Sequence, residues 1–176
     1  MTQKSLTAVY LRRGKEESLE RCHPWIFSGA IERITEGLKP LSEGDIVDVY
    51  TKQGNFIARG HYQIGSIAVR VLSFEEESID QAWWNRRIAA AKALRESLGM
   101  VDNAQTSCYR LIHGEGDLLP GLVVDIYERT AVVQCHSVGM YHSRSYIAEA
   151  IREAYGDRIE AIYDKSSQTL PYKAEL

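Results

Sequence analysis

The sequence lacks long apolar runs and is poor in cysteine, and both absences exclude classes of protein. No run approaches the roughly eighteen apolar residues of a membrane span, and residues 1–15 lack a basic region followed by an apolar stretch. We therefore expect no membrane partner and no secretory signal. The three cysteines, Cys22, Cys108 and Cys135, are odd in number and far apart. They indicate reduced thiols in a cytoplasmic protein rather than a disulfide framework.

Loops that bind nucleotide cofactors are also missing. The sequence contains neither the phosphate-binding pattern GxxxxGK[ST] nor a GxGxxG between a strand and a helix, and no serine has a nucleophile-elbow context. We therefore expect that this chain binds no cofactor and no metal. If the chain belongs to an enzyme, we expect the catalytic machinery to lie elsewhere.

Charge is unevenly distributed along the chain. Up to Leu72 there are 10 Lys and Arg against 8 Asp and Glu, a net +2, and from Ser73 onward there are 11 against 16, a net −5. The overall −3 argues against strong non-specific affinity for nucleic acid, since that affinity grows with the number of phosphates neutralised. A local basic face on the first part, or an ordinary mixed surface, both remain open.

The first part of the chain is predicted to be rich in strands. Short apolar or alternating runs lie at residues 6–11, 45–50, 56–58 and 67–72, separated by glycine-containing turns such as Gln53-Gly54-Asn55. Four short strands within about seventy residues are typical of a small barrel or sandwich. Between the first two runs, His23-Pro-Trp-Ile-Phe27 predicts short helical turns that pack aromatic rings on the barrel, with Phe27 in the core.

The second part is predicted to be mixed α/β. The acidic run 73–78 is interpreted as a solvated linker or the lead-in to a helix. Ser78-Ile-Asp-Gln81 then resembles a capping box, and helical spacing continues to a stop at Gly99. The basic residues of this helix are more simply explained as its solvated face than as an RNA-binding stripe. Strands are expected at 107–112, 122–127, 130–136 and 159–163, with a helix at 143–155.

The stretch between the first two of these strands, RLIHGEGDLLPGLVVDIY, raises the question of a catalytic loop. In an extended segment His113, Glu115 and Asp117 could share one face, where an imidazole and carboxylates could do acid–base chemistry or bind a metal. The neighbouring glycines and Pro120 are turn formers, so a polar turn between strands is the default interpretation. The pairs Cys22-His23 and Cys135-His136 are poorly spaced for zinc, and Cys108 is expected to be a buried, inert thiol.

Several motifs in order resemble one family along the whole chain. They are His23-Pro-Trp-Ile-Phe-Ser-Gly-Ala-Ile31, Gly44-Asp-Ile-Val-Asp-Val-Tyr50, Gly54-Asn-Phe-Ile-Ala-Arg-Gly60, Ile67-Ala-Val-Arg-Val-Leu72 and the stretch 110–127. The first four resemble the N-terminal PUA domain of the ribosomal RNA large-subunit methyltransferase I family, and the fifth resembles its central α/β domain. The resemblance implies an α+β fold, with a PUA-like RNA-binding β-barrel at 1–73 and a helix plus central α/β domain at 74–176.

The same resemblance implies a function. Members of the family methylate cytosine C5 in 23S rRNA with S-adenosylmethionine, in a C-terminal domain that holds the cofactor loop and the catalytic cysteine. Because this chain ends at Leu176, before either could appear, we expect a fragment of a cytoplasmic enzyme of rRNA processing. We expect it to bind RNA, to hold no catalytic residue and to be inactive alone; homodimerisation is left open.

Candidate RNA contacts follow from the implied PUA domain. Duplex RNA hides its base edges in a deep, narrow major groove, so phosphate and shape contacts dominate its recognition. The cations predicted to contact phosphates are Arg12, Arg13, Lys15, Arg59 and Arg70, and the predicted base or sugar contacts are His23 and Trp25.

The sequence departs from the family pattern at two places, and two alternative functions remain open. Leu118 occupies a position where the family often has Gly, and Asp164-Lys-Ser-Ser167 stands where Glu-Arg-Ser-Asp is common. The rival functions are a stand-alone RNA-binding adaptor without catalysis, and a small hydrolase or metal site in the loop of His113, Glu115 and Asp117.

Overall fold

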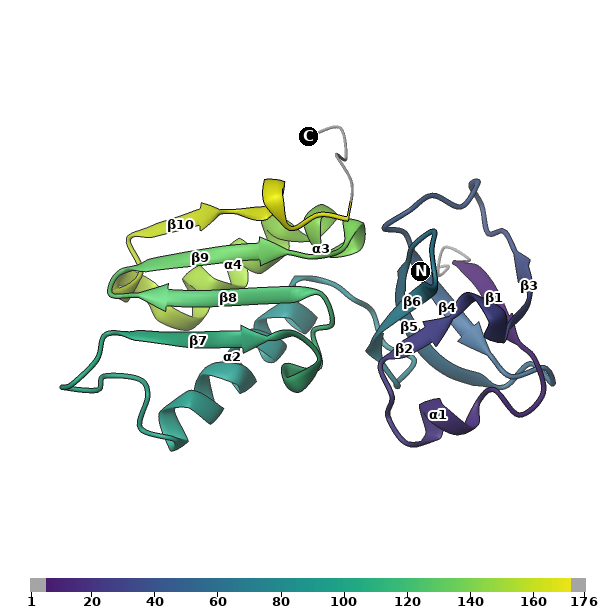
Figure 1. Cartoon of the computed structure of the whole chain (residues 1–176), viewed down its shortest axis with the longest axis horizontal. Coiled ribbons are helices and arrows are strands. Elements are labelled where there is room, and N and C mark those ends of the chain that lie inside the picture. The colour runs from purple at the N-terminus through teal and green to yellow at the C-terminus, as the bar shows by residue number, and fades with distance from the viewer. Residues whose placement is uncertain (1–5, 172–176) are drawn as a thin grey trace. The chain divides into compact units, whose positions relative to one another are not determined.

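The computed structural model describes residues 6–171, which divide into two compact units on either side of the bond between Glu77 and Ser78. The first unit is built on a six-stranded sheet and the second on a four-stranded sheet backed by helices (Figure 1). The predicted α+β fold, with a PUA-like barrel before a mixed α/β unit, is confirmed. None of the helices within residues 6–171 combines the length and apolar character needed to cross a membrane.

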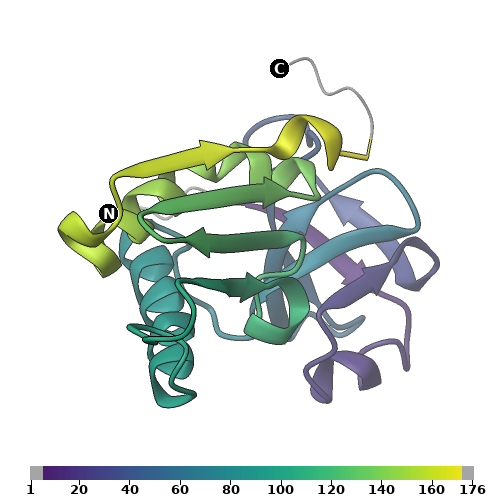
Figure 2. The ribbon, with the colours of Figure 1, turned by 60° about the vertical axis from the view of Figure 1, so that its left-hand side comes forward.

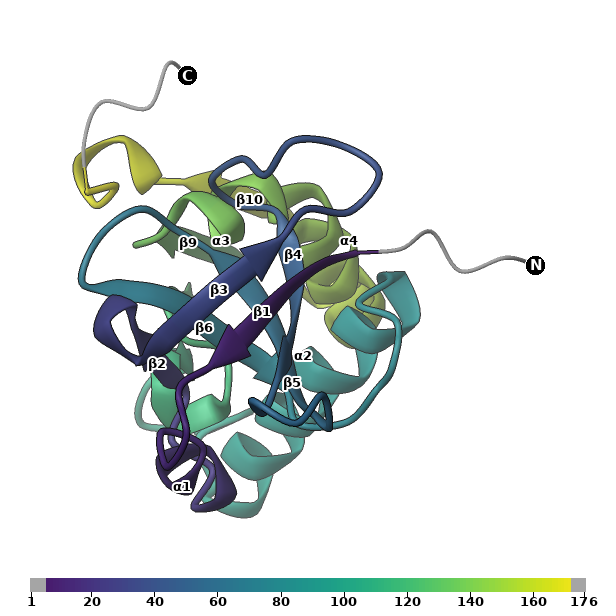
Figure 3. The same ribbon diagram turned by 90° about the vertical axis from the view of Figure 1, so that its right-hand side faces the viewer.

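The first unit is a strongly curled sheet whose strand order is β2-β6-β5-β4-β1-β3 (Figure 3). All neighbouring strands are antiparallel except β1 and β4, which are parallel. Its elements are β1 Thr7–Leu11, α1 Glu17–Glu20, β2 Trp25–Phe27, the 3₁₀ turn η1 Ser28–Ala30, β3 Ile31–Thr35, β4 Ile46–Tyr50, β5 Phe56–Tyr62 and β6 Ile67–Ser73.

Alternating strands place one face of this sheet in the core. Val9 and Leu11 of β1 face Val47 and Val49 of β4 there, all fully buried, and Leu19 of α1 closes the cluster. Such alternation is what period-two patterning predicts. The expectation of helical turns between the first strand and residue 45 is only partly correct, because this stretch also forms β2 and β3.

The acidic run after β6 is held to the first unit rather than left as a free linker. Arg59 donates to the carbonyl oxygen of Glu77, and Ser73 Oγ donates to Glu77 Oε1 at 2.7 Å. The sequence pattern alone predicts a domain boundary after residue 73. These contacts give a physical reason why residues up to Glu77 belong to the first compact unit.

The second unit has two layers, with helices on one face of a sheet in the order β10-β9-β8-β7 (Figure 2). Strands β7, β8 and β9 are antiparallel neighbours, and β10 returns parallel to β9 after a helical crossover. The elements are α2 Gln81–Ser97, β7 Cys108–His113, the 3₁₀ turn η2 Gly114–Asp117, β8 Leu122–Tyr127, β9 Thr130–Cys135, α3 Val138–His142, α4 Arg144–Tyr155, η3 Gly156–Arg158, β10 Ala161–Asp164 and η4 Ser166–Gln168.

Helix α2 packs against α4 and β7, and it differs from the predicted pattern in detail. The residue that caps its N-terminus is Asp80, whose side chain accepts from the Trp83 amide at 3.0 Å, so the expected capping box at Ser78 is wrong. Helical spacing leaves Leu94 and Arg95 as alternatives for the buried face, and the structure buries Arg95 while Leu94 is exposed. An arginine there requires a partner, because a buried charge is costly when it is unpaired.

Candidate functional site

A pocket of about 350 Å³ lies between α1 and β2 in the first unit. Strand β2 forms one wall, and it is held in place by pairing with β6, where Trp25 and Ile26 lie opposite Arg70 and Val69. The lining residues are Lys15, Ser18, Trp25, Ile26, Phe27, Gly29 and Ala30. The pocket therefore combines one cation, aromatic rings and small residues that allow close approach to the backbone.

Three rings form an aromatic cluster at this pocket. His23 and Trp25 meet edge to face with centroids 5.9 Å apart, and Trp25 meets Phe27 in the same manner at 6.4 Å. Phe27 is 49% exposed, so the prediction that it is a core residue is wrong. A β-bulge between Ile26 and Phe27 shifts the register at this point of the strand. Exposed aromatic faces at a pocket are suited to stacking or to sugar contacts.

The backbone also orients the imidazole of His23. The amide of Trp25 donates to His23 Nδ1 at 3.2 Å. The same Nδ1 lies 3.3 Å from the Trp25 carbonyl oxygen, so the backbone of Trp25 offers this nitrogen both a donor and an acceptor and fixes the ring at this edge. Sequence reasoning predicted both His23 and Trp25 as contacts, and the structure brings the two side chains together.

The exposed cations of the β1–α1 connection lie beside the same pocket. Arg12 and Ala30, a lining residue, are joined by a backbone hydrogen bond of 2.9 Å, and Arg12 Nε donates to the Ile31 carbonyl at 3.2 Å. Lys15 lines the pocket itself, and Arg13 is exposed in the intervening turn. Three of the five predicted phosphate-contacting cations are therefore on or next to one surface.

The two remaining predicted cations are placed differently. Arg70 is half-buried and lies opposite Trp25 in the register, so the two side chains share one face of the sheet, and its Nη1 donates to Gln63 at 3.0 Å. Arg59 is 5% exposed and makes a bidentate ion pair with Asp48 at 2.6 and 3.0 Å. This burial argues against Arg59 as a phosphate contact, because its guanidinium is already satisfied inside the unit.

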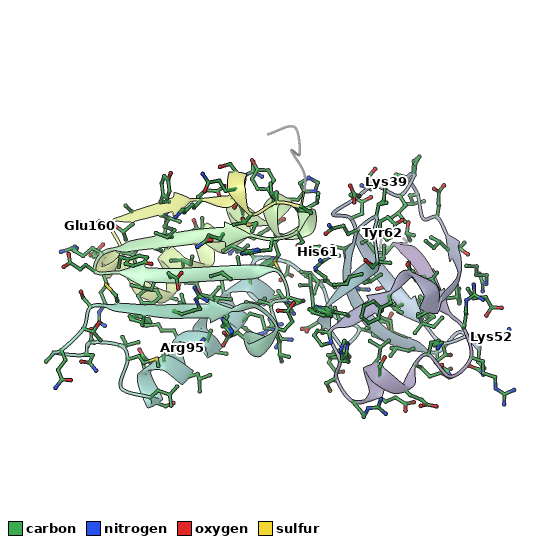
Figure 4. The ribbon with its side chains drawn as sticks, viewed as in Figure 1. Lys39, Lys52, His61, Tyr62, Arg95 and Glu160 are labelled. Carbon is green, nitrogen blue, oxygen red and sulfur yellow. The ribbon has the colours of Figure 1, made fainter. Side chains whose placement is uncertain are left out.

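In the second unit, the polar loop of residues 113–118 is fixed by a buried ion pair. Asp117 accepts from both terminal nitrogens of Arg95 and from the backbone amide of His113, and its side chain is 4% exposed. Figure 4 labels Arg95 on α2. Arg95 Nε also donates to the carbonyl oxygen of Arg110 at 3.0 Å. Asp117 therefore joins a helix to a strand, and its carboxylate is occupied by Arg95.

The other candidates for chemistry in this unit are separated from one another. His113 and Glu115 are exposed, and within residues 6–171 no group of three His, Cys, Asp or Glu side chains is arranged to hold a metal. Cys108 is exposed, so the expectation of a buried thiol at this position is wrong: it lies at the start of an edge strand. Cys135 is the buried cysteine, and burial raises its pKa to about 11.

Comparison with known proteins identifies a PUA-like domain in the first unit and similar proteins for nearly the whole chain. The model of the PUA-like domain family matches residues 9–74. The chain is 39% identical over 172 residues to ribosomal RNA large subunit methyltransferase I of Photobacterium profundum, covering 97% of this chain and 42% of that protein. It is likewise 39% identical over 170 residues to the protein of the same name from Erwinia tasmaniensis, covering 96% of this chain and 41% of that protein.

Solved structures show the same fold at lower identity. A putative SAM-dependent methyltransferase from Streptococcus mutans matches with a TM-score of 0.73 and 18% identity, over 90% of this chain and 40% of that one. A putative methyltransferase complexed with SAH matches with a TM-score of 0.74 and 18% identity, over 96% of this chain and 43% of that one. The chain spans about two fifths of the length of the curated relatives it matches. Over nearly its whole length it is similar to the ribosomal RNA large subunit methyltransferase I proteins, and it carries a PUA-like domain at residues 9–74.

Proposed function

We propose that this chain is the RNA-gripping portion of a cytoplasmic, SAM-dependent rRNA methyltransferase that modifies cytosine C5 in 23S rRNA. The observation that carries the proposal is the pocket between α1 and β2, where Lys15 and the aromatic pair His23 and Trp25 lie together beside Arg12. Cations position a phosphate backbone, and aromatic faces accept bases or sugars. The similarity to these proteins supports RNA as the partner.

In this proposal the three cations bind phosphates and the rings contact the nucleotide. Lys15 in the pocket wall binds the phosphate nearest the rings, and Arg12 and Arg13 bind phosphates farther along the strand. Backbone hydrogen bonds pre-arrange these groups, so little entropy is lost when RNA binds. The first 72 residues carry a net charge of +2, whereas the sequence from Ser73 onward is net acidic. This difference supports RNA binding by the first unit rather than by the second.

The methyl-transfer chemistry is assigned to the parts of the parent protein outside this chain. Methylation at C5 of cytosine requires a thiolate that attacks C6 and so activates C5. Cys135 cannot supply this thiolate, because it is fully buried and its pKa is raised to about 11. The sequence also has no strand–GxGxxG–helix loop for the cofactor, so we derive no step through S-adenosylmethionine on these residues.

What the chain itself contributes is positioning. A base inside an RNA duplex must be unstacked before an enzyme can reach it, and a separate domain that holds the flanking RNA fixes the target while this happens. Alone, the chain is expected to bind RNA and to transfer no methyl group. Incubation with RNA and radiolabelled S-adenosylmethionine would check the second expectation.

Fluorescence anisotropy with a labelled RNA hairpin, measured across a salt series, tests the grip. We expect salt-sensitive binding, and we expect Lys15→Ala to weaken it and to reduce the slope of log K against log salt by about 1, as for one lost phosphate contact. Lys39→Ala is the matched control, because Lys39 is an exposed lysine of the same unit that is paired with Asp45. Absence of salt-sensitive binding by the unaltered chain would overturn the proposal.

A further inference from the structure

A row of stacked side chains crosses four neighbouring strands on the first unit's sheet, away from the pocket. The strands are β3, β1, β4 and β5, and Figure 3 shows β1 between β3 and β4. Register places Arg33 opposite Tyr10, Tyr10 opposite Tyr50 and Tyr50 opposite Phe56. Each residue is exposed or half-buried, while the intervening residues of β1 and β4 face the core. The row therefore lies on the outer face of the sheet.

The geometry makes this row a stack of two tyrosine rings with a cation over one end and an edge-on phenylalanine at the other. The Arg33 guanidinium carbon lies 3.4 Å from the centroid of the Tyr10 ring. Tyr10 and Tyr50 are stacked with centroids 5.4 Å apart and an interplanar angle of 25°, and Phe56 meets Tyr50 edge to face at 5.9 Å. Cross-strand aromatic pairs and a cation over a ring are each favourable, so the rings hold the guanidinium plane in place.

Arg33 terminates the stack at the edge of the sheet. It lies on the edge strand β3 and is exposed, and its Nη1 donates to Thr35 Oγ1 at 2.9 Å, which fixes the plane a second time. The adjacent acid, Glu32, is paired with Lys52 at 2.9 Å, so its charge is offset. The guanidinium face opposite Tyr10 is the position where one more planar group would extend the stack.

This end of the stack is connected to the proposed RNA pocket by a short piece of chain. Ala30 lines the pocket, and β3 begins at the next residue. Three residues of strand span about 10 Å, which is the length of about three stacked nucleotides. Arg12 lies between the two places, since it is hydrogen-bonded to both Ala30 and Ile31. A strand held in the pocket could therefore run along β3 to Arg33.

We propose that Arg33 is a stacking subsite for one unpaired base of the bound RNA, at the end of the row Arg33, Tyr10, Tyr50 and Phe56. The inference rests on the proposed RNA-binding function and adds the kind of RNA: a duplex flanked by a single-stranded segment. Arginine planes stack on unpaired bases, and such stacking tolerates any sequence because every base has a π face. The alternative is that the row only supports the sheet.

The test compares two RNA hairpins with the same stem, one blunt and one with four unpaired adenosines at each end. The measured quantity is the ratio of their dissociation constants, blunt over tailed, by fluorescence anisotropy. We expect a ratio of about ten for the unaltered chain, as for one stacked base, and a ratio near one for Arg33→Lys. Lysine keeps the charge but has no planar group to stack.

Arg144→Lys is the matched control, because Arg144 also lies over a tyrosine ring, with its guanidinium carbon 4.1 Å from the Tyr141 centroid, in the second unit. It should keep the tenfold ratio. Circular dichroism and the melting temperature of Arg33→Lys establish that the sheet is intact. An unchanged ratio in Arg33→Lys, or a ratio of one in the unaltered chain that still binds both hairpins, overturns the subsite alone. No binding to either hairpin overturns the proposed function together with it.

Discussion

Removing the carboxylate of Asp117 should strongly destabilise the second unit. The Asp117→Ala change leaves the guanidinium of Arg95 buried, with the carbonyl oxygen of Arg110 as its remaining hydrogen-bond acceptor among residues 6–171, and it removes the acceptor for the His113 amide. The side chains of Arg95 and Asp117 are 10% and 4% exposed, so water screens the pair little. Breaking a buried ion pair on one side costs about 3–5 kcal/mol, a large share of the roughly 5–15 kcal/mol that stabilises a typical domain.

The unfolding of the second unit in urea can be measured separately from that of the first unit by tryptophan fluorescence. Two of the three tryptophans, Trp83 and Trp84, are buried on α2, so in a Trp25→Phe background the fluorescence reports the second unit. With a typical slope of about 2 kcal/mol per molar urea, a loss of about 4 kcal/mol lowers the midpoint by about 2 M. The double change Arg95→Met with Asp117→Leu should restore most of the loss, because it leaves no charge unpaired.

A surface pair of the same type provides the control. Arg158 and Asp102 form an ion pair at 2.7 Å, but their side chains are 57% and 70% exposed. Asp102 has φ 57°, which Asn tolerates as well as Asp, so Asp102→Asn removes the charge without a backbone cost and should change the free energy of unfolding by less than about 1 kcal/mol. If Asp117→Ala cost no more than Asp102→Asn, or if the double variant were as unstable as the single one, the reasoning from burial would be refuted.

Two further substitutions test the backbone geometry, and a thiol reaction tests the burial of Cys135. Leu118→Gly should stabilise the second unit by about 0.5–1 kcal/mol in the same urea assay, since Leu118 has φ 57° and is 44% exposed; a loss of stability would contradict this. Gly60→Ala should cost about 2 kcal/mol or more, because the added Cβ would lie 2.2 Å from the Arg70 carbonyl oxygen; amide hydrogen exchange in β5 measures this, and unchanged protection would refute it. The two exposed thiols, Cys22 and Cys108, should react with Ellman's reagent at pH 8 in the folded chain, whereas Cys135, with a pKa raised to about 11, should react only in urea; three thiols reacting in the folded chain would show that Cys135 is accessible.

The elements that could be predicted from the sequence are those with a regular pattern of burial. Alternation along residues 45–50 identified β4, and the apolar run 67–72 after the turn at Gly65-Ser66 identified β6; both strands contribute buried residues to the core. Strand β2 has only three residues, and β3 has its side chains exposed or half-buried, so neither shows an apolar period. Helix α3 has five residues, too few to show a helical period. These three elements depend on their neighbours rather than on a pattern of their own.

The candidate site was predictable in composition but not in arrangement. The motif His23-Pro-Trp-Ile-Phe27 marked the right residues, yet they were expected to form helical turns, and neither strand β2 nor the exposure of Phe27 could be read from the residue types. Arg59 resembles any other strand arginine until Asp48 is seen opposite it in the register. Arg33 was missed for a related reason, since its contact with Tyr10 exists only because β1 and β3 pair across the sheet.

The polar stretch between β7 and β8 shows why side-chain chemistry alone misleads. Its carboxylates resemble an active site, but Asp125 is paired with Arg110 at 2.8 Å and Asp117 with Arg95, which lies on a helix 22 residues earlier in the chain. A turn that connects two strands and also packs on a helix is held in one conformation by polar contacts. A charged side chain that makes such contacts in a buried place requires a partner of opposite charge. A charged loop is therefore better judged by asking which of its charges are already neutralised. By that criterion the pocket between α1 and β2, where Lys15 is exposed, is better suited to bind an anion than this loop.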